Sequence, residues 1–250
     1  MLLRFIGLVA AFCLATPFPG EAKGAADDRV LVDPTIMPWR AIGRINKQTV
    51  GGHCTGTLVG PATVLTAAHC LWNKRTRDWM PAGSVHFLAG YKGGEWVAHS
   101  PGKKLIISPD YKASQSKKTP YSRASTDWAF IELEKPIGEK IGWFAIEPMG
   151  ATSFTAFKAK NYQVTQAGYS ADKPHALSVV QTCKLVGFVS KWPLFHHSCF
   201  TRSGDSGSPL FFQTADGYAV IGIHIGSRTG PQGRVGLGLP SDVFREALGK

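Results

Sequence analysis

The sequence predicts an all-β protein with one short helix at its C-terminus. Short runs of β-branched and aromatic residues recur along the chain and are separated by Gly, Pro, Asn and Ser, a pattern typical of a β-sandwich or barrel. The chain has 250 residues, 44% of them hydrophobic, which is enough for a sizeable core. Only Ser241–Leu248 shows a helical repeat, with its apolar residues on one face and Ser241 as the expected N-cap.

The expected strands fall into two groups, joined near residues 136–150. We therefore expect an N-terminal β-domain over residues 27–140 and a C-terminal β-domain over residues 150–250. A polar segment, residues 110–126, is expected to be a long exposed loop. The expected strands are Arg40–Ile45, Thr55–Val59, Thr63–Thr66, Val85–Ala89 and Asp127–Leu133, then Tyr162–Gly168, Gln181–Val189, Ser208–Gln213, Tyr218–Ile225 and Val235–Pro240.

The first 26 residues have the layout of a secretory signal peptide. One Arg is followed by an apolar run from Phe5 to Ala15, and then by Pro and Gly. Small-x-small patterns place the cleavage near residues 22–26. The apolar run is too short to cross a bilayer. We expect an exported protein, secreted or periplasmic, without a membrane span.

The chain is strongly basic, with a formal net charge of +11. Its positive charges come in short clusters, such as Lys103-Lys104 and Lys117-Lys118, without a basic helix or an aromatic RNA-binding pattern. This pattern favours a solvated face, with attraction to anionic surfaces or acidic polypeptides as the alternative. No nucleic-acid partner is expected.

Four cysteines remain once Cys13 leaves with the signal peptide. An even count in an exported protein favours two disulfides. The spacing suggests that Cys54 pairs with Cys70 and that Cys183 pairs with Cys199.

A zinc site built from His196, His197 and Cys199 is the alternative use of this region. It is disfavoured because adjacent histidines on an extended segment point to opposite sides. Metal-ligand spacing is also lacking there. We expect neither a metal nor an organic cofactor.

Three short motifs each carry one residue of a possible nucleophilic site. His69 lies in Thr66-Ala-Ala-His-Cys, Asp127 opens an apolar strand, and Ser206 lies in Gly204-Asp-Ser-Gly-Ser-Pro. Taken singly, these residues are explained by a structural histidine, a surface aspartate and a polar turn. Taken together, they supply a hydroxyl, a base to take its proton and a carboxylate to orient the base. Glycines beside Ser206 would let the Gly204 and Ser206 N–H groups converge on a developing oxyanion.

The segments TAAHC, DWAFIEL and GDSGSPL occur in the order His, Asp, Ser and resemble those of the chymotrypsin-like (trypsin-like) serine proteases. The resemblance covers nearly the whole chain after Ala41. It implies two six-stranded antiparallel β-barrels with the active site between them. It also implies His69 as general base and acid, Asp127 as its orienting carboxylate, Ser206 as nucleophile, and the Gly204 and Ser206 amides as oxyanion hole. The implied protein is a secreted serine endopeptidase that acts on polypeptides. We also expect a monomer.

The specificity residues resemble those of one branch of this family. Phe200 stands where trypsin has the aspartate that selects Lys or Arg. Thr201 and His224 match positions at which bacterial glutamyl endopeptidases bind the glutamate of the substrate. The resemblance implies a preference for Glu before the scissile bond. Since relatives in this branch keep such a histidine while cleaving after other residues, other preferences stay open, and Arg202 and Arg228 are further candidates for shaping the pocket.

Asp205 raises the question of activation by proteolysis. In trypsin-like enzymes, the acid before the nucleophile pairs with a new N-terminal amine. Cleavage at Arg29-Val30 would expose Val30 for that role. Against this, Val30-Leu-Val-Asp departs from the family's Ile-Val-Gly-Gly, and residues 27–29 resemble a segment that some glutamyl enzymes retain.

Two other functions compete with the protease. One is a catalytically silent relative that acts as a binding protein, since fold alone does not guarantee chemistry. The presence of all three triad residues speaks against it. The other is an esterase of a different fold, which is disfavoured because the Gly-x-Ser-x-Gly elbow and alternating helices are missing.

Overall fold

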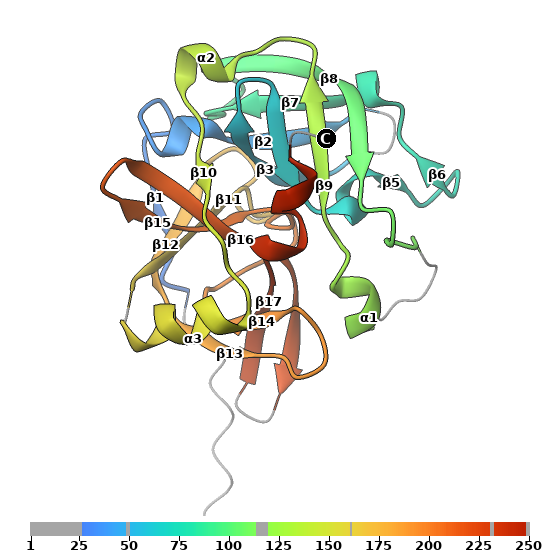
Figure 1. The fold of residues 1–250 in the computed structure, drawn as a ribbon. Helices are drawn as coiled ribbons and strands as arrows, with labels where there is room; N and C mark the ends of the chain where they lie inside the picture. The colour runs from blue at the N-terminus through green and yellow to red at the C-terminus, as the bar shows by residue number, and fades with distance from the viewer. Residues whose placement is uncertain (1–26, 49–50, 114–119, 161, 231–232, 249–250) are drawn as a thin grey trace, which may run out of the picture.

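The protein is described by a computed structural model (Figure 1). The expected signal peptide, Cys13 and Lys117-Lys118 lie outside the described residues. Among the helices that are described, none is long and apolar enough to cross a membrane. The described residues are 27–48, 51–113, 120–160, 162–230 and 233–248.

The first half of the chain forms a closed barrel of six strands. They follow one another around the barrel as β2-β3-β4-β9-β8-β7, all pairs antiparallel. The expected strands of this half are present, and one more strand, β8, was not expected. Its middle, Pro-Gly-Lys-Lys, lacks apolar alternation, so only its pairing with neighbours makes it a strand. The strands are β2 (Ile42–Lys47), β3 (His53–Gly60), β4 (Thr63–Thr66), β7 (Val85–Ala89), β8 (Ala98–Ile107) and β9 (Ala129–Leu133).

The second half forms a sheet that wraps back on itself. Hydrogen bonds connect its strands in the order β1-β12-β11-β15-β16-β17-β14-β13. Since β12 and β13 are separated only by Lys184, this path returns to its start through the chain itself, and the two act as one bent strand of a six-stranded barrel. The strands are β1 (Val30–Leu31), β11 (Val164–Gly168), β12 (Ser178–Cys183), β13 (Leu185–Phe188), β14 (Phe195–His197), β15 (Pro209–Thr214), β16 (Gly217–Gly230) and β17 (Gly233–Pro240).

These two halves confirm the all-β, chymotrypsin-like fold class. The connection between them contains α2 (Gly138–Ile141) and β10 (Ala145–Ile146), which pairs parallel with β16. The division at residues 140–150 stays a prediction. A two-stranded hairpin, β5 (Trp72–Asn73) with β6 (Asp78–Trp79), projects from the first barrel, and α1 (Tyr121–Ala124) lies within the segment expected to be a loop.

The predicted C-terminal helix is wrong in type. Ser241–Val243 and Arg245–Ala247 form two 3-10 turns, η4 and η5, rather than one α-helix. Ser241 does not cap, because its hydroxyl donates to the carbonyl of Glu147. Phe244 lies between the turns, fully buried, with its ring against Phe130 of β9. In Figure 1 these red turns lie beside the first barrel, so the C-terminus connects the two halves.

None of the three α-helices among the described residues was expected, and the longest of them is α3. The segment Ala151–Ala159 forms α3, which packs beside β13 and buries Phe154 and Phe157. Its apolar residues are too few to stand out in the sequence. The phenylalanines join a second, smaller core around the Cys183–Cys199 disulfide.

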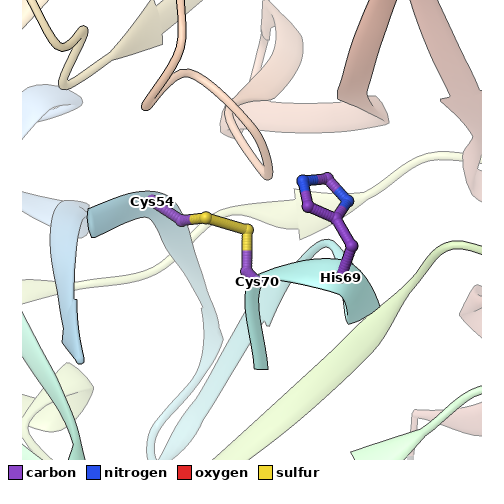
Figure 2. A group of neighbouring side chains, drawn as sticks. All are labelled: Cys54, His69 and Cys70. Atoms are coloured by element: carbon purple, nitrogen blue, oxygen red, sulfur yellow. A yellow bond between two sulfur atoms is a disulfide. The ribbon is translucent and has the colours of Figure 1, made fainter. Parts of the chain in front are cut away.

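Both expected disulfides are present. Cys54 pairs with Cys70, and Cys183 pairs with Cys199. The first joins β3 to the 3-10 turn η2 (Ala68–Leu71), which carries His69 (Figure 2). This bond fixes the position of the His69 turn relative to the barrel.

Candidate active site

His69 and Asp127 are held together by two hydrogen bonds. The Nδ1 atom of His69 lies 2.7 Å from Oδ2 of Asp127, and the His69 amide donates to Oδ1 at 2.9 Å. The Asp127 side chain is 3% exposed and that of His69 is 33% exposed. A buried carboxylate therefore fixes the imidazole by both its ring and its backbone, and leaves the other ring edge toward solvent. This arrangement matches a base with its orienting acid.

Ser206 lies in a turn that only glycines permit. Gly204 and Gly207 have φ angles of +95° and +83°. A Cβ on Gly204 would collide with the carbonyl oxygen of Tyr169 and the ring of His53, and one on Gly207 would collide with β3 and β4. Ser206 lines the same cleft as His69.

The backbone around Ser206 provides two N–H groups without internal acceptors. The amides of Asp205 and Gly207 donate to the carbonyls of Arg202 and His224 at 3.2 and 2.8 Å. Among the described residues, the Gly204 and Ser206 amides make no such bond. Backbone N–H groups near the core are nearly always paired, so two unused donors beside a nucleophile are a feature of an oxyanion hole.

Thr55 positions this turn and was missed in the sequence. Its amide donates to the Ser206 carbonyl at 3.0 Å, and its hydroxyl donates to the Gly204 carbonyl at 3.0 Å. The same hydroxyl accepts from the Tyr169 amide at 2.9 Å. Thr55 is fully buried in β3 of the first barrel and thus holds the Ser206 turn against that barrel. No motif marks it, because a lone threonine in a strand resembles any other.

The Ser206 turn also contains a buried acid. Asp205 is 1% exposed and accepts hydrogen bonds from the Ser170 hydroxyl and the Arg202 amide. Burial raises the pKa of Asp205 to about 6. Val30, the other member of the expected activation pair, is 45% exposed in β1, where it pairs with Val179.

Arg29 is locked in place in the uncut chain. Its guanidinium binds the carboxylates of Asp27 and Asp172 at 2.8 and 2.6 Å and lies 4.7 Å from the centre of the Phe200 ring. The Arg29 side chain is only 1% exposed. A protease that cleaves after Arg29 would have to break these two ion pairs to bind the Arg29 side chain. The two carboxylates also raise the pKa of Arg29 above its ordinary range.

The chain belongs to the trypsin family. The family model described as trypsin matches residues 32–247. A glutamyl endopeptidase of Bacillus licheniformis is 29% identical over 200 residues, which cover 80% of this chain and 57% of that protein. An extracellular metalloprotease of Bacillus subtilis is 25% identical over 232 residues, or 90% of this chain and 68% of that protein. The chain thus spans a little over half of the first relative and two thirds of the second.

A solved structure of a Glu endopeptidase shares this fold. The TM-score is 0.70 at 18% identity, and the match covers 91% of this chain and 99% of that one. This likeness shows the fold, and the glutamyl endopeptidase of Bacillus licheniformis is a relative of this trypsin-family chain by sequence.

The two expected specificity residues are both buried. His224, in β16, is 2% exposed, and its Nδ1 lies 3.0 Å from Nε2 of His197 in β14. The Thr201 hydroxyl lies 3.1 Å from the Ser227 hydroxyl, also in β16. Burial is the main cause that lowers the pKa of His224 well below its ordinary value, and the neighbouring His197 lowers it further. His224 is therefore neutral in the free trypsin-family protein at physiological pH.

The other pocket candidates contact aromatic rings. The Arg202 guanidinium lies 5.0 Å from the centre of the Phe200 ring, and the Arg29 guanidinium lies over the same ring. Arg228 lies 4.1 Å from the centre of the Tyr121 ring. Phe200 thus contacts two guanidinium groups, and it packs against the smaller core around the Cys183–Cys199 disulfide.

One relative is named a metalloprotease, so we asked whether the described residues of this chain could bind a metal ion. Among the described residues, one group offers three potential ligands close together: Cys54, His69 and Cys70 (Figure 2). The two sulfurs are bonded to each other, so they are not the thiolates that bind metals. His69 Nδ1 is already engaged by Asp127. This donor set does not fit a metal ion.

Proposed function

We propose that this chain is an exported serine endopeptidase that cleaves polypeptides through an acyl-enzyme on Ser206. One observation carries the proposal most directly: Ser206 and His69 line one cleft, beside a buried carboxylate on one side and two unused amides on the other. The two disulfides and the named extracellular relative support export. A monomer remains our expectation.

The mechanism follows from these positions. His69 takes the Ser206 proton as the hydroxyl oxygen attacks the substrate carbonyl. Asp127 keeps the His69 proton on Nδ1, so that Nε2 is the basic atom, and stabilises the resulting imidazolium. The carbonyl oxygen becomes negative and accepts from the Gly204 and Ser206 amides. His69 then gives its proton to the leaving amine, and water hydrolyses the ester by the same steps.

We further propose that glutamate is preferred before the scissile bond. The Nδ1 atom of His197 is buried and has no partner among the described residues. A lone pair without a donor costs less than an N–H without an acceptor, so we assign the His197 proton to Nε2, where it donates to His224. His224 then carries its own proton on Nε2.

A site of this kind offers donors but few acceptors. The His224 Nε2–H and the Thr201 hydroxyl could both donate to a carboxylate, which has two acceptor oxygens. A glutamine would bring an NH2 group that needs acceptors of its own. Burial of an unpaired NH2 is costly, so Glu is favoured over Gln. The glutamyl endopeptidase relative is consistent with this preference.

A serine-directed fluorophosphonate tests the enzyme itself. The exported, processed protein should be labelled, and Ser206→Ala should not be. The matched control is Ser203→Ala, which changes a serine of the same loop that has no assigned role in the chemistry. Equal labelling of Ser206→Ala would overturn the proposal and favour the silent binding protein.

Cleavage at Arg29-Val30 is a separate part of the proposal. The new Val30 amine would have to leave its place in β1 to reach Asp205, whose burial favours a positive partner. N-terminal sequencing of active protein should give Val30. A start at Lys23 or Asp27 would contradict the activation step and leave the catalytic proposal intact.

A further inference from the structure

The cleft beside the triad is open, and its chemistry differs from that of the specificity residues. It has a volume of about 510 Å³ and runs from Ser206 and His69 past the Cys54–Cys70 disulfide. Its far wall comes from the end of β2 and from the β5–β6 hairpin. Three basic residues line it: Lys47, Lys74 and Arg75.

The position of His69 decides which part of a substrate enters this cleft. In the proposed mechanism, His69 gives its proton to the leaving amine, so the residues after the scissile bond lie on the His69 side of Ser206. Thr201 and His224 are proposed to receive the residue before the bond. The cleft lined by Lys47 and Lys74 is left for the leaving segment.

Two of these basic residues, Lys47 and Lys74, have no ion-pair partner among the described residues. No Asp or Glu is among the residues that line this cleft. Burial lowers the pKa of Lys47, and the positive charge of Lys74 lowers it further, so the two like charges interact.

The hairpin turn that carries Lys74 is ordered. The Asn73 side chain accepts from the amides of Arg75 and Thr76 at 3.0 and 3.3 Å, and Arg77 adopts a left-handed conformation with φ of 57°. The Trp72 and Trp79 rings pack edge to face across the hairpin. The basic groups therefore sit on a defined support beside the triad.

We propose that this cleft binds the residues after the scissile bond and selects substrates with acidic side chains there. The inference rests on the proposed serine endopeptidase function and adds a second specificity to it. An aspartate or glutamate in the leaving segment would bring a carboxylate between Lys47 and Lys74 and remove their repulsion. A lysine in that place would add a third like charge.

Quenched fluorescent peptides test this inference. Each carries glutamate before the scissile bond and Asp, Asn or Lys at the first or second position after it. We expect kcat/KM to be about threefold to tenfold higher for Asp than for Asn at low salt, and lowest for Lys. In a Lys47→Gln, Lys74→Gln double variant, the Asp-to-Asn ratio should fall to about one.

The matched control is Lys184→Gln, which removes an exposed lysine on the opposite barrel, between β12 and β13. Its Asp-to-Asn ratio should equal that of the wild type. An equal ratio in the wild type and the double variant would overturn the inference. If no peptide is cleaved and Ser206 is not labelled, the proposed function fails and this inference with it. Labelling and cleavage without an acidic preference contradict the inference alone.

Acyl transfer gives a second measurement, because the partition of the acyl-enzyme between an amine and water does not depend on the rate of acylation. Aspartyl amide and asparaginyl amide compete with water for the acyl-enzyme formed from an ester substrate. The amine nitrogen bonds to the acyl carbon, the bond to Ser206 Oγ breaks, and His69 carries the amine proton to that oxygen. We expect aspartyl amide to capture several times more acyl-enzyme than asparaginyl amide. Equal capture would contradict acidic selection.

Discussion

The two sides of Ser206 to which we assign substrate binding differ in burial and charge. On one side, His224 and Thr201 are 2% and 5% exposed, and they contact the buried His197 and the partly buried Ser227. On the other, Lys47 and Lys74 line an open cleft without ion pairs among the described residues. Buried neutral donors select by the cost of leaving a partner unpaired, whereas open charges attract over distance and are screened by salt. The same enzyme can therefore have one strict and one graded preference.

Removal of the buried histidine should have the largest effect on this comparison. His224→Ala should lower kcat/KM for Glu peptides about 100-fold relative to Leu peptides, because the carboxylate loses its donor within a buried site. Fluorophosphonate labelling of Ser206 shows whether the active site remains intact.

His196→Ala is the control for this variant. His196 precedes His197 and lies instead near Tyr121, with its Nε2 3.5 Å from the phenol oxygen. The Glu preference should survive its removal. An unchanged Glu preference in His224→Ala would place carboxylate recognition elsewhere.

The second largest effect on activity should come from the Ser206 turn, which lies between the two proposed binding regions. Thr55→Val keeps the shape but removes the hydroxyl that donates to Gly204 and accepts from Tyr169. We expect kcat to fall about tenfold to 100-fold with a smaller change in KM, because the oxyanion amides lose their fixed position.

Thr55→Ser should restore most of the activity, since it returns the hydroxyl. Equal loss in both variants would show that Thr55 acts through packing rather than through its hydrogen bonds. Preferences on either side of the bond should change little, because Thr55 belongs to neither.

Asp205 should give the turn a dependence on pH. Burial raises the pKa of Asp205 from 3.8 to about 6, so the folded, uncut protein binds the proton more tightly than the unfolded chain. Its contribution to stability is complete below pH 4 and is lost as the pH rises through about 6. We expect Asp205→Asn, which stays neutral, to gain roughly 2 kcal/mol on the wild type between pH 4.5 and 7.5.

Urea unfolding at the two pH values measures this difference, and other titrating groups cancel between the proteins. If the chain is cut at Arg29-Val30, the amine of Val30 should reverse the sign, because it would favour the charged carboxylate. A pH-independent difference in the uncut protein would contradict the buried, unpaired acid.

The candidate site residues that lie in short local motifs could be predicted from the sequence. His69, Asp127, Ser206 and Gly204 are each marked by a short local motif, and the structure places His69 on Asp127 and Ser206 in the same cleft. The motif around Ser206 can be recognised in the sequence because its tight turn needs a glycine on each side.

Residues that act through long-range contacts could not be predicted in the same way. Thr55 matters because the Gly204 carbonyl, 149 residues away, meets its hydroxyl. Ser241 was expected to cap a helix, but its hydroxyl donates instead to the carbonyl of Glu147, far away in the sequence. Lys47 and Lys74 lie 27 positions apart in ordinary basic clusters, and only the barrel and the hairpin bring them to one cleft.

Salt dependence, the smallest effect, tests the contrast between the two sides most directly. One peptide matrix varies Glu and Gln before the scissile bond and Asp and Asn after it, at about 50 and 500 mM salt. Screening acts on exposed charges far more than on buried ones. The Glu-to-Gln ratio should hold, while the Asp-to-Asn ratio should fall about twofold to threefold. Ratios that change together, or an Asp-to-Asn ratio that resists salt, would contradict a buried, neutral side and an open, charged side.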